Sequence, residues 1–114
     1  MKFLCSILLL FFFFNCSSQI PKSGTYIYKY CDEEYNKCLE TCKIKIKNDS
    51  IWIYAPANLS GIKEGELLEK GKLVKHKTGK WMIATSEKDK KSKVVGACEG
   101  PAWIDFKKKK FWTC

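Results

Sequence analysis

Hydrophobic and polar residues alternate along most of the chain, which is the pattern of half-buried β-strands. Tyr26, Tyr28 and Tyr30 fall on one face of the first such stretch. Further along, lysine alternates with isoleucine over residues 43–47, ahead of the turn-forming residues 48–50. An apolar stretch follows this turn, so we predict a β-hairpin with its isoleucines in the core and its lysines in water.

Between these two stretches the hydrophobic period changes from that of a strand to that of a helix. Cys31, Tyr35, Cys38 and Cys42 follow one another at offsets of four, three and four. Three acidic residues come directly after the first of these cysteines, where they suit the positive end of a helix dipole. We therefore predict a short helical segment over residues 31–42.

Turn signals divide the rest of the chain into further short strands. Residues 55–65 contain proline, asparagine and glycine and are expected to form a surface loop, and residues 86–93 a charged, mobile connection. Strands are expected at residues 67–75, 80–84, 94–95, 102–106 and 111–112. The first two flank residues 76–79 as a second hairpin. Six to eight short strands in all predict one mostly β domain over residues 19–114, a small antiparallel barrel or sandwich.

The first 18 residues differ from everything that follows. Lys2 precedes an almost uninterrupted apolar run over residues 3–14, and a cluster of small residues comes next. This is the organisation of a secretory signal peptide, and the run is shorter than the about 20 residues that a membrane-spanning helix needs. We therefore expect residues 1–18 to direct export and to take no part in the fold.

Two maturation routes are open at this signal. In a bacterial lipoprotein Cys16 becomes the lipidated first residue, and residues 13–18 resemble a lipobox of small Gram-negative envelope lipoproteins. In the other route an ordinary signal peptidase cuts after Ser18 and exposes Gln19. The lipoprotein route is favoured. It implies a membrane partner through the lipid anchor, whereas the other route implies a periplasmic or extracellular protein.

The positive charge of the chain comes from lysine alone. All 21 basic residues are lysines, and residues 19–114 hold 20 of them against 12 acidic residues, a net charge of +8. Lysine is a strongly hydrated point charge without the bidentate fork of arginine. We therefore expect a solvated surface with loose attraction to an anionic envelope polymer or to lipid headgroups, and no binding of nucleic acid.

Cysteine is frequent for so small a domain. The predicted domain contains five cysteines, Cys31, Cys38, Cys42, Cys98 and Cys114. In an oxidising compartment such cysteines are expected to form disulfides, with the odd one left unpaired. A bridge from Cys114 to Cys98 or to residues 31–42 would tie down the last strand. The sequence leaves the pairing open.

A metal or redox site is the alternative use of these cysteines. Cys38 and Cys42 are four residues apart and could share a metal on one helical face, with Cys31 or His76 completing the shell. The spacing lacks the Cys-x-x-Cys form of zinc knuckles and thioredoxin-type centres. Disulfides are therefore favoured, and we expect no metal and no cofactor.

Few residues suggest catalysis. His76 is the only histidine, and its place in a lysine-rich turn predicts an exposed ring rather than a catalytic base. Glu64, Glu66 and Glu69 offer carboxylates of the kind that glycoside hydrolysis uses, but no second feature accompanies them. We expect the protein not to be an enzyme.

Aromatic residues enclose a lysine block near the end of the sequence. Lys107, Lys108, Lys109 and Lys110 stand between phenylalanines, and Trp112 follows. The functional interpretation is a patch for acidic envelope polymers or lipid headgroups, with the tryptophan suited to an interface. The alternative is a lysine-rich turn or a protected edge strand, which is the favoured interpretation.

Two short similarities complete the sequence picture. Gly24, Thr25 and Tyr26 resemble the opening of lipocalin-like small barrels. Residues 28–32 together with residues 112–114 resemble membrane-bound inhibitors of c-type lysozyme, which implies a compact lipoprotein barrel closed by a disulfide.

These observations favour a non-enzymatic exported envelope protein. We expect a lipid-anchored binding or structural lipoprotein whose ligand is an unknown protein or an anionic polymer. The alternative is a secreted cationic effector or inhibitor that binds an acidic macromolecule, with a lysozyme-inhibitor-like barrel as a variant.

Overall fold

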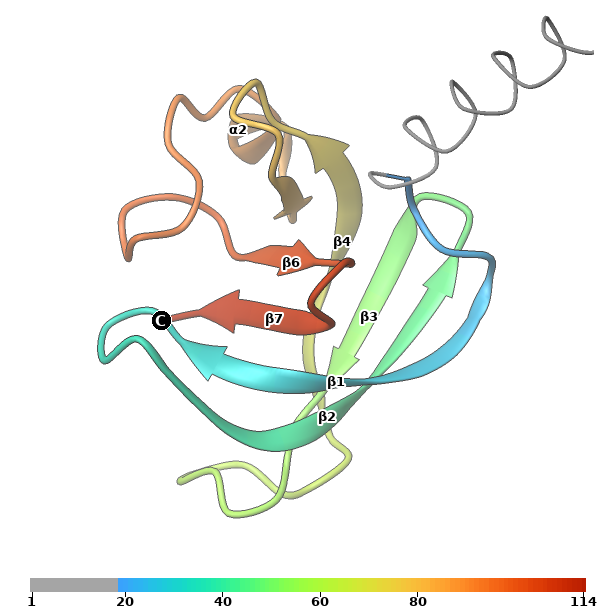
Figure 1. The fold of residues 1–114 in the computed structure, drawn as a ribbon, viewed down its shortest axis with the longest axis vertical. Helices are drawn as coiled ribbons and strands as arrows, with labels where there is room; N and C mark the ends of the chain where they lie inside the picture. The colour runs from blue at the N-terminus through green and yellow to red at the C-terminus, as the bar shows by residue number, and fades with distance from the viewer. Residues whose placement is uncertain (1–18) are drawn as a thin grey trace, which may run out of the picture.

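The structure, a computed structural model, describes residues 19–114 (Figure 1). The described elements are β1 (Gly24–Asp32), β2 (Lys37–Lys47), β3 (Ser50–Tyr54), β4 (Leu67–Lys75), β5 (Trp81–Ala84), α2 (Glu87–Lys90), β6 (Trp103–Asp105) and β7 (Lys110–Thr113). The predicted signal peptide over residues 1–18, including Cys16, lies outside the described residues.

The seven strands form one closed barrel. Each strand pairs with the next along the chain in antiparallel fashion. The barrel closes because β1 and β7 pair in parallel, from Lys29 opposite Lys110 to Asp32 opposite Thr113. The prediction of a mostly β fold with six to eight short strands is confirmed, in its barrel form.

Apolar side chains occupy the barrel interior. Ile44 lies opposite Ile53, and Ile46 lies opposite Ile51, so the alternation predicted for the first hairpin is confirmed. The buried core cluster consists of Tyr28, Tyr30, Cys42, Ile44, Ile46, Ile51, Ile53, Leu73, Ile83, Ile104 and Phe111. Burial of these branched and aromatic side chains is the main favourable contribution to the free energy of folding.

The predicted helical segment over residues 31–42 is wrong. The chain there is a β-hairpin that turns at residues 33–36, with Asn36 in the left-handed region at φ 49°. Cys31 and Cys38 lie directly opposite each other in the hairpin and are disulfide-bonded, with their Cα atoms 3.9 Å apart. Two cysteines that pair across a hairpin turn can therefore have a sequence spacing that also fits a helix.

The described helix lies instead in the connection predicted to be charged and mobile. α2 begins after Ser86, whose hydroxyl oxygen accepts a hydrogen bond from the backbone N–H of Asp89 at 3.2 Å. The chain beyond α2 packs back toward the β4–β5 turn, where the Ser92 carbonyl meets the ring of His76. Residues 94–95 form no strand, contrary to the prediction, and Val95 is buried.

The alternating strand directions gather several turns at one end of the barrel. The chain enters β1 at this end, and the β2–β3, β4–β5 and β6–β7 turns return there (Figure 1). We call this the N-terminal end, consisting of residues 19–23, 48–49, 76–80 and 106–109. The other connections, residues 33–36, 55–66 and 85–102, leave from the opposite ends of the strands.

Candidate functional site

Lysine ammonium groups lie over aromatic rings on the outer faces of the strands. On β3, Trp52 stands between Lys45 of β2 and Lys70 of β4, which are its direct partners in the sheet register. Their Nζ atoms lie 5.4 and 5.9 Å from the ring centroid. At this distance a cation is attracted to the ring face, so the lysines are held near the tryptophan while their charges stay in water.

A second lysine–aromatic cluster covers β6 and β7. Trp103 and Trp112 lie opposite each other with nearly parallel rings, 12° apart, and centroids separated by 6.1 Å. Lys80 lies 4.5 Å from the Trp103 ring centroid, and Lys110 lies 5.8 Å from that of Trp112. The Trp112 of the predicted patch is therefore half of a stacked pair, a feature that depends on strand register and that the residue pattern does not reveal.

The lysine block lies mainly in the β6–β7 turn. The Asp105 carboxylate accepts hydrogen bonds from the backbone N–H groups of Lys107 and Lys108, at 3.1 and 3.0 Å, and so orders the turn. Lys107, Lys108 and Lys109 are exposed, whereas Lys110 already belongs to β7. Residues 107–109 therefore lie in a turn, and binding of the lysine block to an anionic partner stays a prediction. The edge-strand variant is wrong, because β7 is paired on both sides.

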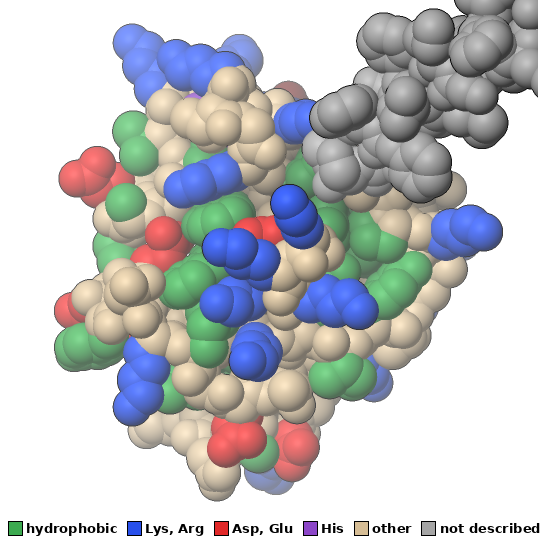
Figure 2. Space-filling model, viewed as in Figure 1, with side chains coloured by type: hydrophobic (Ala, Val, Ile, Leu, Met, Phe, Trp, Pro, Cys, Tyr) green, Lys and Arg blue, Asp and Glu red, His purple; other side chains and the backbone are tan. Residues whose placement is uncertain are grey.

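A shallow hollow adjoins this turn. It has a volume of about 360 Å³, and its wall includes Lys80, Trp81, Trp103, Asp105, Phe106 and Lys107. Figure 2 shows lysine side chains gathered on this face of the molecule with hydrophobic side chains between them. Aromatic surface and positive charge are thus brought together beside the N-terminal end.

The structure pairs four of the five cysteines. Cys98 is bonded to Cys114, with Cα atoms 5.5 Å apart, and this bridge joins the long β5–β6 connection to the residue after β7. Together with the Cys31–Cys38 bridge it leaves Cys42 unpaired. The expectation of disulfides with one odd thiol is therefore confirmed in the described domain.

The alternative metal site at Cys38 and Cys42 does not form, because the Cys38 sulfur is bonded to Cys31 and is not a thiolate donor. Over residues 19–114 no group of three or more histidine, cysteine or acidic side chains gathers to hold a metal ion. In the same residues no helix is long and apolar enough to cross a membrane.

The free thiol of Cys42 lies inside the barrel. It is 2 % exposed, and burial raises its pKa to about 11. A thiol in an unfolded chain has a pKa of about 8.5. Deprotonation therefore favours unfolding, and the stability that the neutral thiol contributes is present below about pH 8.5 and is lost as the pH rises through about 11.

We expect Cys42 of the folded protein to react with iodoacetamide at least about a hundredfold more slowly than an unfolded thiol at mildly alkaline pH, because its thiolate is scarcer and shielded. Mass spectrometry of alkylated peptides measures this, with concentrated guanidinium chloride as the unfolded control. Equal alkylation rates of Cys42 in the folded and the unfolded protein would contradict the burial of this thiol inside the barrel.

His76 is not the exposed ring that its neighbours predict. It is 7 % exposed, and both ring nitrogens have partners. Nε2 lies 3.0 Å from the Ser92 carbonyl oxygen, and Nδ1 lies 2.9 Å from the hydroxyl and 3.3 Å from the backbone nitrogen of Thr78. These partners assign the proton to Nε2 and the acceptor role to Nδ1. His76 therefore joins the β4–β5 turn to the connection after α2.

The three glutamates singled out for carboxylate chemistry have different surroundings. Glu64 and Glu66 are exposed in the β3–β4 loop, whereas Glu69 on β4 is half-buried. Burial, and then the negative charge of Asp89, raise the pKa of Glu69. The shift follows from packing that the sequence pattern does not reveal.

Comparison of the chain with protein-family models, with curated proteins and with solved structures found no match.

Proposed function

We propose that this chain is a non-enzymatic, lipid-anchored binding protein of the bacterial cell envelope. The observation that carries the proposal is the division between the interior and the surface of the barrel. Apolar side chains fill the interior, and lysines paired with aromatic rings cover the outer faces. A ligand would therefore bind outside, where the positive charge suits an acidic protein or an anionic envelope polymer.

The outer face of β2 and β3 supports a binding role best. Lys43, Lys45 and Lys47 point outward from β2, and the first two lie over Tyr54 and Trp52 of β3. Flat aromatic rings flanked by cations offer both apolar contact and charge to an acidic partner. This arrangement requires no catalytic group and no cofactor.

Lipid anchoring is tested by labelling. We expect cells that express the full chain to incorporate labelled palmitate into the protein, and Cys16→Ser to abolish the incorporation because the acceptor sulfur is gone. Autoradiography of the purified protein is the measurement, and Cys42→Ser is the matched control that should remain labelled. Label that survives in Cys16→Ser, or no label in the unaltered chain, would contradict the proposed anchor.

A second candidate is a secreted cationic effector or inhibitor, favoured by the exposed charges of Lys107, Lys108 and Lys109. In this case the mature protein would begin at a pyroglutamate formed from Gln19, without lipid. It would bind an acidic macromolecule, and neutralisation of the lysine block would release that partner. Unchanged binding after neutralisation would remove the basis for this candidate.

A further inference from the structure

The two ends of the barrel carry opposite charge. The N-terminal end contains six lysines, Lys22, Lys77, Lys80, Lys107, Lys108 and Lys109, and one acidic residue, Asp49. The connections at the other strand ends, residues 33–36, 55–66, 85–89 and 94–102, hold two lysines against seven acidic residues. Residues 90–93, with three lysines, line a hollow with His76 and Lys77 of the N-terminal end. The surplus positive charge is therefore concentrated where the chain enters the barrel.

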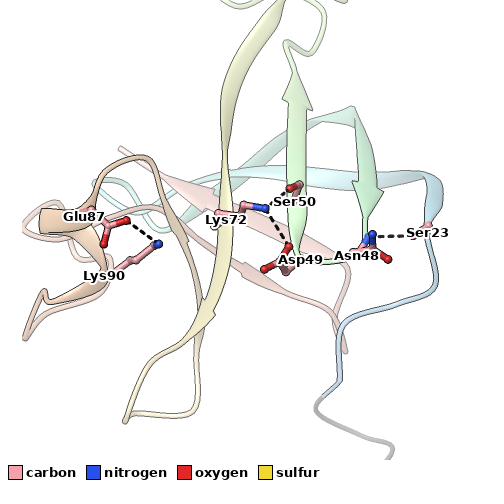
Figure 3. A network of polar contacts seen from close by, with 7 residues as sticks. All are labelled: Ser23, Asn48, Asp49, Ser50, Lys72, Glu87 and Lys90. Carbon is pink, nitrogen blue, oxygen red and sulfur yellow. Dashed lines mark hydrogen bonds and ion pairs between the residues drawn. The ribbon is translucent and has the colours of Figure 1, made fainter.

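The acidic residue at the N-terminal end is already neutralised. Lys72 donates to the Asp49 carboxylate at 3.1 Å and to the Ser50 hydroxyl at 2.9 Å (Figure 3). The hydrogen bond from Lys72, followed by its positive charge, lowers the pKa of Asp49 and keeps this carboxylate ionised and paired. Asp49 therefore does little to offset the lysines around it.

The chain just before β1 is fixed to this end. Ile20 packs against the barrel core, and Gln19 and Ile20 line one hollow with Lys75 and Trp81. A little further on, the Ser23 hydroxyl accepts a hydrogen bond at 3.0 Å from the backbone N–H at position 48 in the β2–β3 turn (Figure 3). Gln19, the first described residue, thus lies at the most positive end of the barrel.

In the sequence, the proposed anchor is close to this point. Cys16 precedes Gln19 by three residues, which span at most about 10 Å. Surface charges interact over a Debye length of about 8 Å at physiological ionic strength. A lipid on Cys16 would therefore hold the N-terminal end within electrostatic reach of the headgroups of its own membrane.

We propose that the N-terminal end of the barrel docks on anionic phospholipid headgroups, as a second membrane contact beside the lipid. The inference rests on the proposed anchor at Cys16. Docking brings the lysines of the end and the aromatic rings of Trp81 and Phe106 to the interface, a position that suits tryptophan. The outer face of β2 and β3 remains available to another partner. A basic surface beside the lipid adds electrostatic attraction to anionic headgroups.

The test is lysine footprinting of the purified, lipidated mature protein. The protein is reconstituted into vesicles of phosphatidylcholine, with or without phosphatidylglycerol, and treated with an amine-reactive reagent before peptide mass spectrometry. We expect anionic vesicles to slow modification of Lys80 and Lys107 about fivefold or more. Lys37 and Lys63, at the other end, should keep their rates. High salt should restore reactivity, because it screens the attraction.

Two triple variants with the same net charge distinguish docking of the N-terminal end from attraction of the whole positively charged protein to the vesicles. Lys107→Gln/Lys108→Gln/Lys109→Gln should lose the protection of Lys22 and Lys80 on anionic vesicles. Lys37→Gln/Lys63→Gln/Lys88→Gln lowers the net charge equally and should retain it. Equal protection in both variants would overturn the inference.

Four other outcomes are decisive. Lipid on Cys16 with no protection on anionic vesicles would overturn docking and leave the anchor intact. Equal protection on neutral vesicles would overturn recognition of anionic headgroups. Protection by soluble polyglutamate alone would identify an acidic polymer as the partner instead. Absence of lipid from Cys16 would overturn the anchor and the docking inference together.

Discussion

Replacing Gly71 by alanine is expected to lower the free energy of unfolding by about 3 kcal/mol. Gly71 lies in β4, and a Cβ atom there would stand 2.6 Å from the carbonyl oxygen of Ala84 and 2.9 Å from Cγ2 of Ile83. Both belong to β5, which is hydrogen-bonded to β4. Relief of the clash therefore requires the two strands to separate. Urea denaturation of the unreduced protein measures the loss.

Gly24 provides the matched control. It opens β1, and the nearest atoms to its added Cβ lie at 3.9 Å, an ordinary contact distance. Gly24→Ala should therefore change the unfolding free energy by less than about 0.5 kcal/mol. A Gly71→Ala variant as stable as Gly24→Ala would show that β4 and β5 do not approach as closely as described.

Removing the Cys98–Cys114 bridge with Cys98→Ser/Cys114→Ser is expected to destabilise the protein by about 3 kcal/mol. The bridge closes a sequence separation of 16 residues, and it holds a segment in which Gly96, Ala97 and Cys98 all have positive φ. Outside this bridge, Glu33 accepts a hydrogen bond from the Ala97 N–H at 2.8 Å, which ties the same segment to the β1–β2 turn. Without the bridge, only hydrogen bonds and packing hold this backbone.

The other bridge serves as the comparison. Cys31→Ser/Cys38→Ser removes a bridge that spans only seven residues, so the loss should be smaller, about 2 kcal/mol. Urea denaturation of both double variants gives the order. A larger loss of unfolding free energy on removal of the Cys31–Cys38 bridge would contradict the expectation that the Cys98–Cys114 bridge stabilises the fold more.

Local alternation was enough to predict the two hairpins and the fold class. The period-two pattern of Ile44 and Ile46 and the turn residues between the strands specify pairing over short distances. The sequence could not predict how the barrel closes, because β1 and β7 pair across almost the whole domain. No residue pattern within either strand encodes a parallel partner so distant.

The errors arise from pairings that residue spacing alone does not reveal. The helix expected at residues 31–42 arose from cysteine offsets, although the hairpin there is held by a bridge whose pairing no spacing rule reveals. His76 was expected in water, but the segment after α2 covers it and supplies its Ser92 partner. The stacking of Trp103 on Trp112 likewise follows from register between β6 and β7.

The expectations for the N-terminal segment remain predictions. Signal-peptide organisation, lipidation of Cys16 and export rest on sequence pattern, and the residues concerned lie outside the described structure. The disulfides of the barrel are consistent with an oxidising compartment. The lysines gathered at the N-terminal end predict that an anchor at Cys16 brings this end against anionic headgroups, and lysine footprinting measures that contact.

Intact-mass analysis of the mature protein, with and without reduction, tests the account most directly. We predict a chain that begins at a lipidated Cys16 and gains two hydrogens for each of its two disulfides on reduction. Without reduction, alkylation should reach a single further thiol, Cys42, and only after unfolding. A chain that begins at Gln19 without lipid would contradict the anchor, and a mass unchanged by reduction would contradict the disulfide-bonded barrel.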